Sequence, residues 1–485
     1  MDMSKYDVVI GLEVHVKVKT ASKMFCSCEN KYGAEPNTLV CPVCMGYPGV
    51  LPVPNKEAIN KTILAGLSCG CMIAKYSKFD RKSYFYPDMP KNYQISQYDL
   101  PFCLNGKIEI GGKGFSGNNL SEKIIGITRI HLEEDVAKST HFAGASGIDF
   151  NRAGSPLMEI VSEPDMATPD EAYAYLTEIK QIMQYAGISN CDMEKGELRC
   201  DVNVSLKPSG ATEFGTKIEI KNLNSFRAVH RSLVHEIKRQ RIELDEGNSL
   251  VQETRGWNDD KGITYLMRVK ESESDYRYFP EPDLMPVVLS EEEIDAIRST
   301  MPESPSAMRK RFVDDYSLTP YDAEVMCQEK TIAEYFDRAS KKVSTPKLLA
   351  NWIISELLRE LSDAGITIDQ CKIKPDMLAE MIEMINKNTI SGKIAKKVFA
   401  EMFASGKSPE SIVKEKGLVQ VTDTSAIEGF VEQALADNQS QVQQYLDGNE
   451  KILQYFVGQV MKLSKGKANP GMVVKILKEK LSVMG

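Results

Sequence analysis

With 485 residues, the chain is longer than one hydrophobic core usually serves, and we expect two or three domains. Its 42% apolar and 26% charged residues are ordinary globular usage, and no apolar run is long enough to span a bilayer. The net charge of −8 argues against a protein whose whole surface binds nucleic acid.

The first residues pass directly into a strand-like pattern, without the basic and apolar segments of a secretory signal. The eleven cysteines then fit a reducing compartment, where they serve as buried residues or metal ligands rather than as disulfides. We therefore expect a cytoplasmic protein.

Up to about residue 290, alternating apolar and polar residues between turn-forming residues predict β-sheet with a few helices. The first strand, residues 7–20, is the clearest. Its even positions from 8 to 18 are all Val, Ile or Leu, whereas Glu13 and His15 lie on the opposite face. Further strands are expected at 127–136, 198–206 and 216–221, and helices at 57–67 and 170–185.

Four cysteines lie close together in the sequence, as Cys26-Ser-Cys28 and Cys41-Pro-Val-Cys44. Two close pairs separated by a short loop can place four thiolates around a tetrahedral Zn²⁺. Four thiolate ligands leave no open coordination position, so such a site would be structural rather than catalytic. The alternative is four reduced cysteines packed in a core, but their density along the chain favours zinc.

Charged residues also gather on the polar faces of the predicted strands. Glu13 and His15 share one such face, Glu133 lies on the polar face of 127–136, and Glu159 lies in 157–163 with Glu163. Carboxylates with one imidazole suit Mg²⁺, the ion that usually holds ATP phosphates. The alternative is the solvated face of an ordinary antiparallel sheet, and the pattern alone favours that alternative.

Two further strands place charged residues that suit phosphate and metal. Residues 198–206 place Arg199, Asp201 and Asn203 on one polar face. Residues 216–221 place Lys217, Glu219 and Lys221 on another. Cross-strand ion pairs would explain the same pattern. The sequence has no G-x-x-x-x-G-K-[ST] motif, so ATP would have to bind outside a P-loop.

A basic and aromatic motif covers residues 78–86. Lys78, Arg81 and Lys82 precede Tyr84-Phe-Tyr86, a mixture that could cradle phosphate or stack on a 3′-terminal adenine. A charged turn before an aromatic strand explains each residue equally well. The motif is therefore a second candidate for contacts to ATP or RNA.

After residue 283 the sequence becomes helical. Ser290 and Glu293 form a capping-box pattern, and an apolar stripe runs over 348–361. Residues 407–411 have the composition of a linker before a small helical tail. From residue 386 onward there are 14 Lys against 10 acidic residues. This excess is either a solvated helix face or a surface that contacts phosphates.

The motifs taken together resemble the B subunit of aspartyl/glutamyl-tRNA amidotransferases (GatB). The resemblance rests on Val9-Ile-Gly-Leu-Glu-Val-His15, Tyr47-Pro-Gly-Val-Leu-Pro52, His131-Leu-Glu-Glu-Asp135, and residues 78–88, 93–97, 159–165, 217–226, 275–283, 390–399 and 458–470. These motifs span nearly the whole chain and are long and specific.

The resemblance implies an α+β fold: a mainly antiparallel-sheet "cradle" kinase domain over residues 1–293 with a zinc loop of four cysteines, an all-α helical domain over 294–406, and a YqeY-like all-α tail over 407–485. It implies two protein partners, an amidase (A) subunit that releases ammonia from glutamine and a small (C) subunit. The tail and the helical domain are expected to bind tRNA(Gln) or tRNA(Asn).

The resemblance also implies the chemistry. ATP and Mg²⁺ would phosphorylate the side-chain carboxylate of Glu or Asp misacylated on the tRNA, and ammonia would displace the phosphate. Carried over by motif, the Mg²⁺ ligands are Glu13, His15, Glu133 and Glu159, and the structural zinc ligands are Cys26, Cys28, Cys41 and Cys44. Contacts to ATP are expected from Lys78, Arg81, Lys82, Arg199, Asp201 and Lys217. One alternative is a tRNA scaffold without its own chemistry. A zinc-dependent hydrolase is a further alternative, disfavoured because four Cys ligands leave no open coordination position.

Overall fold

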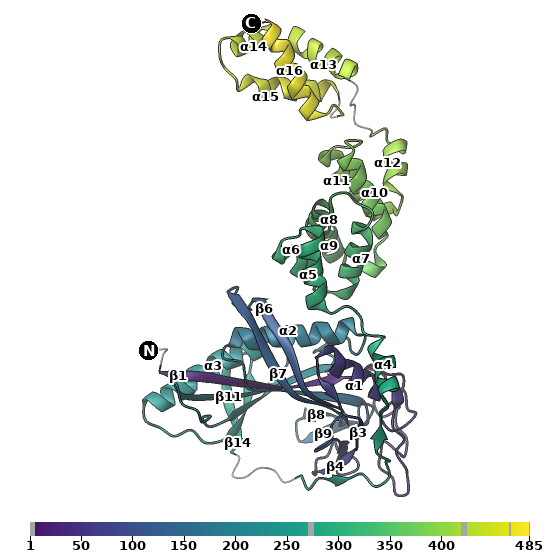
Figure 1. Ribbon diagram of the computed structural model, residues 1–485, viewed down its shortest axis with the longest axis vertical. Helices are drawn as coiled ribbons and strands as arrows, with labels where there is room; N and C mark the ends of the chain where they lie inside the picture. Colours follow the sequence, from purple (N-terminus) through teal and green to yellow (C-terminus); the bar gives the residue numbers. More distant parts are fainter. Residues whose placement is uncertain (1–4, 270–275, 419–423, 465–466, 485) are drawn as a thin grey trace. The chain divides into compact units, whose positions relative to one another are not determined.

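The computed structural model describes residues 5–269, 276–418, 424–464 and 467–484 (Figure 1). Two compact units are present, Met1–Pro305 and Ser306–Gly485. The first contains a large sheet with helices, and in the second the described secondary structure is helical. The chain is therefore an α+β protein. Asp275 of one quoted motif and Lys465 of the basic tail lie outside the described residues.

The first unit is built on a nine-stranded sheet with the order β14-β13-β12-β11-β1-β10-β7-β6-β2. Neighbouring strands are antiparallel, except that β12 and β13 are parallel. The strands are β1 (Tyr6–Lys17), β2 (Met72–Ile73), β6 (Cys103–Lys113), β7 (Asn119–Glu134), β10 (Pro156–Ser162), β11 (Leu198–Pro208), β12 (Ile218–Leu223), β13 (Glu253–Asn258) and β14 (Ile263–Val269). The predicted strands at 7–20, 127–136, 198–206 and 216–221 are confirmed.

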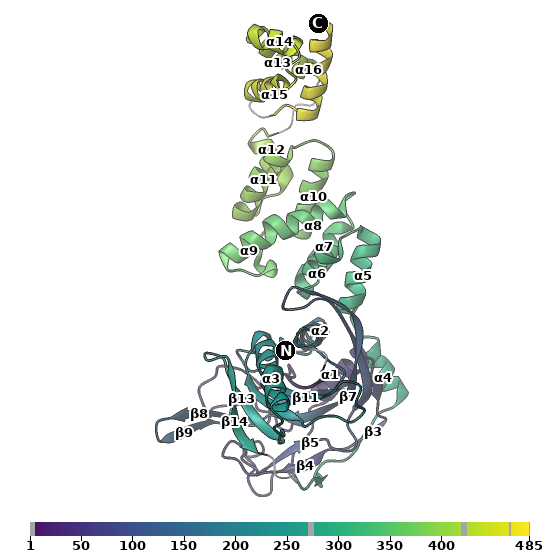
Figure 2. The same ribbon diagram turned by 90° about the vertical axis from the view of Figure 1, so that its left-hand side faces the viewer.

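Helices cover one face of this sheet, and small sheets lie on the other (Figures 1 and 2). Ile10, Leu12, Val14 and Val16 of β1 are at most 1% exposed, because they pack into the core beneath the helices. The predicted alternation of β1 is therefore confirmed. The helices are α1 (Lys56–Ser68), α2 (Pro169–Tyr185), α3 (Phe226–Asp245) and α4 (Glu291–Arg298), and the first two confirm the predicted helices at 57–67 and 170–185.

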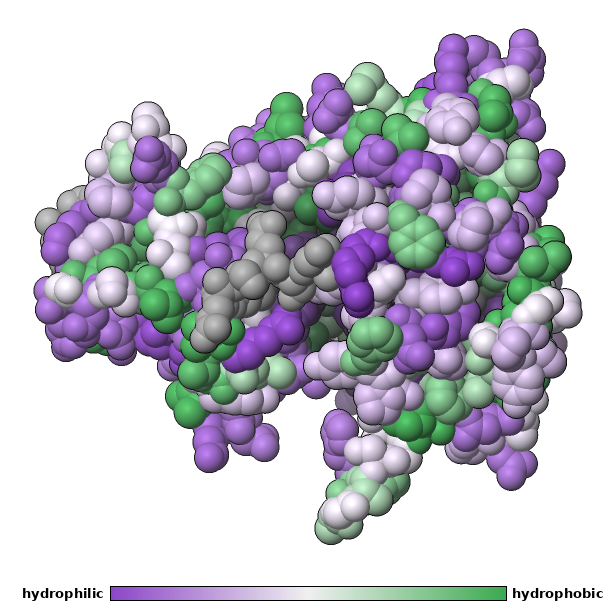
Figure 3. Space-filling model, turned by 90° about the horizontal axis from the view of Figure 1, so that it is seen from below, coloured by the Kyte–Doolittle hydropathy of each residue, from purple (hydrophilic) through white to green (hydrophobic). Residues whose placement is uncertain are grey.

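The opposite face of the sheet carries the polar residues of β1. A small sheet with the order β15-β4-β5 packs there, through contacts between β5 and the long strand β7. Seen from this side, hydrophilic residues predominate and hydrophobic residues form separate small groups (Figure 3). The remaining strands are β3 (Tyr76–Ser77), β4 (Asp80–Ser83), β5 (Tyr93–Ser96), β8 (Lys138–Phe142), β9 (Ala145–Asp149), β15 (Phe279–Pro280) and β16 (Val287–Val288).

The second unit confirms the helical texture but not the expected linker. Ser408 caps a helix that begins at Pro409, so residues 407–411 are not a linker. The predicted capping box of Ser290 and Glu293, which lies in the first unit, is confirmed at α4. The helices of this part are α5 (Pro305–Tyr316), α6 (Pro320–Met326), α7 (Lys330–Ser340), α8 (Pro346–Trp352), a π-turn (Ile353–Leu357), α9 (Leu358–Ala364), a 3₁₀ turn (Ile368–Gln370), α10 (Pro375–Asn386), α11 (Gly392–Ser405) and α12 (Pro409–Glu415).

The last four helices have a hydrophobic core of their own. Its fully buried members, each 0% exposed, are Ile427, Val431, Phe456, Val460, Val473 and Leu477. The helices are α13 (Thr424–Ala436), α14 (Gln439–Leu446), α15 (Ile452–Leu463) and α16 (Pro470–Met484). Among the described residues of the whole chain, we find no helix both long and apolar enough to cross a membrane.

Candidate active site

Strand register assembles a first polar cluster at the centre of the large sheet. Strand β10 lies between β1 and β7, and its Glu159 pairs with His15 on one side and with His131 on the other. Glu133 follows His131 by two positions on β7, so both side chains lie on the same face. Residues that are far apart in the sequence therefore meet at one place.

The contacts within this cluster are short. His15 Nε2 lies 3.3 Å from Glu159 Oε2, and His131 Nε2 lies 3.5 Å from the same oxygen and 3.6 Å from Glu133 Oε2. Ser96, at the end of β5, donates a hydrogen bond of 3.0 Å to Glu133 Oε2. Glu133 is 2% and Glu159 7% exposed. The polar face is therefore covered by β5 at this point and is not the solvated sheet face of the alternative interpretation.

Lys82 of β4 supplies the positive charge for the two carboxylates. Burial lowers the pKa of Lys82, but the nearby negative charges of Glu133 and Glu159 outweigh burial and raise this pKa above its usual value. In the same way, burial raises the pKa of Glu159, whereas His131, His15 and Lys82 hold it well below its usual value. The cluster is thus a buried arrangement of charged groups that stabilise one another.

The donor set of this cluster fits a divalent cation. One ligand atom each from His15, Glu133 and Glu159 lies within 4.8 Å of the others. Oxygen ligands of an octahedral Mg²⁺ lie about 3.0 to 4.2 Å apart, which follows from bond lengths near 2.1 Å. Two buried carboxylates this close repel each other unless cations lie between or beside them. The residues present can therefore hold a metal ion with little movement.

Glu13 belongs to a second cluster rather than to the first. Its carboxylate, with those of Asp201 and Glu219, forms a group whose oxygens also lie within 4.8 Å of one another. Lys221 Nζ lies 3.0 Å from Glu219 and forms an ion pair with Asp201 as well. Asn203 donates a hydrogen bond of 2.9 Å to Glu13. An all-oxygen set is the donor chemistry that Mg²⁺ prefers.

The two clusters are neighbours along β1. Glu13 and His15 are two residues apart on one face, a spacing of about 7 Å in a strand. The four predicted Mg²⁺ ligands are thus divided, with His15, Glu133 and Glu159 in one cluster and Glu13 in the next. Their role as ligands stays a prediction.

The basic motif at residues 78–82 is split between the two faces of the small sheet. Lys82 lies close enough to the first cluster for Glu133 and Glu159 to raise its pKa, whereas Arg81 makes a bidentate ion pair with Glu281 at 2.6 and 2.8 Å. Lys78 is paired with Asp80 and with Asp99. The structure therefore brings one of the three predicted ATP contacts, Lys82, to the carboxylates.

Three predicted contacts lie on β11 and beside β12. Arg199 pairs in register with His15 and holds Asp135 at 2.8 Å. Asp201 is part of the second cluster. Lys217 is exposed and precedes β12, so the structure does not bring it into either cluster. These residues keep the status of predictions.

Five residues of the two clusters were not predicted as ligands or contacts. Four were visible only as members of polar strand faces, namely His131, Asn203, Glu219 and Lys221, and Ser96 gave no signal beyond its motif at 93–97. The information that selects them is the pairing of strands, which alternation within one strand does not contain. His131 Nδ1 is buried and has no hydrogen-bond partner among the described residues. A bound ligand could supply that partner.

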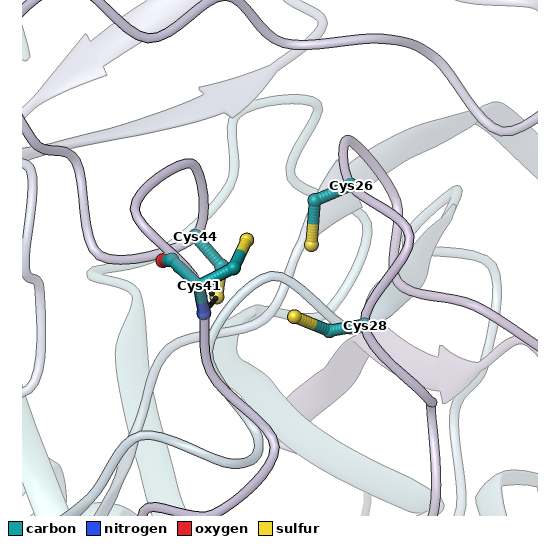
Figure 4. Close-up of side chains that lie close together, drawn as sticks. All are labelled: Cys26, Cys28, Cys41 and Cys44. Atoms are coloured by element: carbon teal, nitrogen blue, oxygen red, sulfur yellow. Dashed lines mark hydrogen bonds between the residues drawn. The ribbon is translucent and has the colours of Figure 1, made fainter.

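The four predicted zinc ligands do come together. The sulfur atoms of Cys26, Cys28, Cys41 and Cys44 lie within 4.8 Å of one another and point toward a common centre (Figure 4). Sulfur atoms around a tetrahedral zinc lie about 3.8 Å apart, which follows from Zn–S bonds of about 2.3 Å. This four-cysteine cluster can therefore bind a structural metal ion, whose chemical contribution would be to hold the loop folded.

A cavity of about 250 Å³ lies between the small sheet and the metal loop, residues 18–55, which join β1 to α1 and carry the four cysteines. One wall is residues of the loop from Phe25 to Pro52, and the other includes Arg81, Lys91, Tyr93 and Glu134. Its charged residues are already paired, Arg81 with Glu281 and Lys91 with Glu134. The metal loop therefore lies across this cavity from strands β4, β5 and β7, which carry Lys82, Ser96 and Glu133.

Comparison with known proteins gives concordant results for both units. The model of the "GatB/GatE catalytic domain" matches residues 8–295, and that of the "GatB domain" matches residues 334–481. A protein of Carboxydothermus hydrogenoformans, named as the B subunit of an aspartyl/glutamyl-tRNA(Asn/Gln) amidotransferase, is 53% identical over 485 residues, covering 99% of this chain and 100% of the relative.

Two further relatives carry the same name. One, from Caldanaerobacter subterraneus subsp. tengcongensis, is 53% identical over 480 residues, with 99% of this chain and 100% of the relative covered. The other, from Thermodesulfovibrio yellowstonii, is 51% identical over 480 residues, with 98% and 100% covered. Such identity over the full length shows that the chain belongs to the family of aspartyl/glutamyl-tRNA(Asn/Gln) amidotransferase B subunits, which are parts of a glutamine-dependent ligase.

Proposed function

We propose that this subunit uses ATP to phosphorylate the side-chain carboxylate of Glu or Asp misacylated on tRNA(Gln) or tRNA(Asn), and that the reaction takes place at the two carboxylate clusters. The observation that carries the proposal is the convergence of His15, Glu133 and Glu159 from three adjacent strands, with Lys82 beside them. The relatives' names supply the substrate class, a tRNA bearing aspartate or glutamate.

The chemistry requires activation because a carboxylate is a poor acyl donor. A carboxylate oxygen attacks the γ-phosphorus of ATP, and the bond from that phosphorus to the β–γ bridging oxygen breaks, so ADP leaves. Ammonia then attacks the acyl carbon, loses a proton, and phosphate departs with the electrons of the C–O bond. Phosphoryl transfer of this kind needs positioning and charge neutralisation rather than a protein nucleophile.

Each cluster has a defined part in this proposal. His15, Glu133 and Glu159 would hold one Mg²⁺, and Glu13 with Asp201 and Glu219 can hold a second. Bound Mg²⁺ would supply charge neutralisation at the phosphates. Lys221 forms ion pairs with two carboxylates of the second cluster, and Lys82 is the ammonium group whose pKa the carboxylates of the first cluster raise. Their ammonium groups would offset the negative charge that ATP brings to the site.

The partners and the metal loop complete the proposal. Ammonia would come from glutamine through the amidase subunit, and a small third subunit would complete the heterotrimer. The sheet-bearing part, residues 1–293, would be the kinase cradle. Residues 294–406 and the tail, 407–485, would bind the tRNA, with the tail lysines contacting phosphates. The four-cysteine cluster would hold a structural zinc.

The proposal is tested with the reconstituted heterotrimer, supplied with Glu-tRNA(Gln), ATP, Mg²⁺ and glutamine. In the variant Glu159→Gln, we expect Gln-tRNA formation to fall by about 100-fold or more, because a metal ligand and a balancing charge are lost. Glutamine hydrolysis by the amidase subunit should persist.

The matched control is Glu163→Gln. Glu163 lies just past the end of the same strand, is exposed, and accepts a hydrogen bond of 2.7 Å from Thr128 outside both clusters. We expect near-normal transfer from this variant. If Glu159→Gln also transfers normally, the clusters are structural ion pairs and the chain acts as a tRNA scaffold.

A further inference from the structure

Lys23 is a fully buried lysine in the metal-binding loop, with 0% of its surface exposed. Its ammonium nitrogen lies 3.6 Å from Cys44 Sγ and 3.3 Å from the carbonyl oxygen of Phe150. Among the described residues, no carboxylate lies within ion-pair distance of this nitrogen. A buried ammonium is costly without a counter-charge, and the nearest group that can carry a negative charge is the Cys44 sulfur.

The charge of a tetrathiolate centre explains why an ammonium belongs there. Four thiolates around Zn²⁺ carry a net charge of −2, which is also costly inside a protein. Cys44 is the one buried ligand of the four, at 5% exposed, and water is least able to stabilise its sulfur. The same sulfur accepts a hydrogen bond of 3.2 Å from the Cys41 backbone N–H. Lys23 thus lies at the ligand that most needs a second donor.

The turn that Lys23 contacts is also fixed to the strand that carries Glu133. The backbone N–H of Gly154 donates to Asp135 at 2.9 Å, and its carbonyl accepts from Met24 at 2.7 Å. Gly154 has φ +81°, and a Cβ there would lie 3.4 Å from Cys44 Cβ and 3.8 Å from Glu134 Oε2. The metal loop and Asp135, directly after β7, therefore both hold the same turn, residues 150–155.

We propose that Lys23 is the buried counter-cation of the four-cysteine metal centre and links this centre, through the turn at Phe150–Gly154, to the end of strand β7. The inference concerns how the metal loop positions Glu133 and Glu134. It rests on the metal-binding capacity of the four cysteines and not on the phosphoryl transfer proposed above, so either can fail without the other.

The first test measures zinc release from the full-length protein in its complex, with the absorbance of 4-(2-pyridylazo)resorcinol as the readout. Lys23→Met removes the ammonium and keeps the length of the side chain. We expect zinc to be released about tenfold faster or more, because charge-assisted contacts to the thiolate are lost. The control is Lys31→Met, an exposed lysine of the same loop, which should release zinc at the wild-type rate.

A second variant and a second readout cover the case in which Lys23→Met does not fold. Lys23→Gln keeps a donor for the Phe150 carbonyl but has no charge, and it should also release zinc faster than Lys31→Met. Hydrogen exchange should be faster at the Asp135 and Gly154 amides in the zinc-loaded variant, and in wild type after zinc removal. Equal zinc release from Lys23→Gln and Lys31→Met, or unchanged exchange at these amides, would overturn the proposal.

Discussion

The metal loop and the carboxylate clusters lie in the same unit but differ in how the sequence encodes them. The four cysteines come from two short segments, and local spacing alone was enough to predict that they meet. The first carboxylate cluster takes its residues from β1, β7 and β10, with Lys82 from β4 and Ser96 from β5. A metal-binding loop is a local property of the chain, whereas a site on a sheet depends on which strands are neighbours.

The four-cysteine cluster and the carboxylate clusters also differ in the function that their residues can have. The four-cysteine cluster is closed, with each sulfur directed at one centre, and it can only hold a structure together (Figure 4). The carboxylate clusters combine acids with His15 and with the ammonium groups of Lys82 and Lys221, a composition suited to bind a charged ligand. Variants of the cysteines should therefore change the stability of the protein, whereas variants of the carboxylate clusters should change the rate of Gln-tRNA formation.

The largest effect is expected from Lys82→Met, which breaks the carboxylate cluster. Removing the ammonium takes away a positive charge that interacts with the buried Glu133 and Glu159, and it removes a cation from the proposed phosphate site. We expect kcat/KM for Gln-tRNA formation to fall by about 10²- to 10³-fold while glutaminase activity persists. Lys75→Met, an exposed lysine paired with Glu291, serves as control and should stay within about twofold. Near-normal transfer by Lys82→Met would contradict this role.

The second largest effect is expected from losing a ligand in the metal loop. Cys28→Ser should lower the free energy of unfolding by about 3 kcal/mol or more, because losing a structural metal is among the most damaging changes. The Mg²⁺ concentration needed for half-maximal transfer should not change. Cys69→Ala removes a buried cysteine outside the cluster and should cost clearly less. Thermal unfolding with and without a chelator, together with an Mg²⁺ titration, checks both points.

A third variant removes a region that holds neither kind of cluster. Deleting residues 419–485 leaves α12 whole, whereas a cut at Ser411 would divide that helix and expose Ile412 and Val413. We expect the KM for charged tRNA to rise by about tenfold, because basic contacts to phosphates are lost, with glutaminase activity unchanged. Kinetics with varied Glu-tRNA(Gln) measures the effect. An unchanged KM would mean that the tail lysines form a solvated helix face.

The smallest effect concerns a histidine that resembles His15 in having a carboxylate partner. His230 lies 3.2 Å from Asp170, but burial outweighs that carboxylate and lowers the pKa of His230. The neutral form is therefore favoured in the folded state, and stability falls as pH drops below the unfolded-state pKa of about 6.5. The variant His230→Gln should lose about 1 to 3 °C less in Tm than wild type between pH 7 and pH 5. Equal losses would show that burial does not control this group.

Much of the fold could be predicted because its signals are local. The alternation of β1 gave both its buried face and the shared face of Glu13 and His15, and the Ser290 capping box marked the start of α4. The linker expected at residues 407–411 was wrong although Ser408 and Pro409 are themselves helix-start residues. The composition of residues 407–411 is typical of a linker, but the capping signal of Ser408 and Pro409 agrees with the observed helix.

The site could be predicted only in part, because its residues come from strands that are far apart in the sequence. Arg81 and Lys82 are adjacent in the sequence but face opposite sides of β4, so Arg81 pairs with Glu281 whereas the charge of Lys82 interacts with Glu133. Lys217 and Lys221 share a predicted face, yet Lys221 joins the second cluster and Lys217 precedes the strand. To predict which residue of each pair joins a cluster, one must know which strand lies next to it and which sheet covers it.

The most direct test of the proposed chemistry follows an oxygen atom. The heterotrimer is supplied with Glu-tRNA(Gln) whose glutamate side-chain carboxylate carries ¹⁸O, together with unlabelled ATP, Mg²⁺ and glutamine. The phosphate released is then analysed by mass spectrometry. If the carboxylate is phosphorylated, one of its labelled oxygens leaves with the phosphate, and we expect one ¹⁸O in each phosphate formed per Gln-tRNA. Phosphate without label would show that ATP is hydrolysed by water, and would contradict an acyl phosphate formed at the carboxylate clusters.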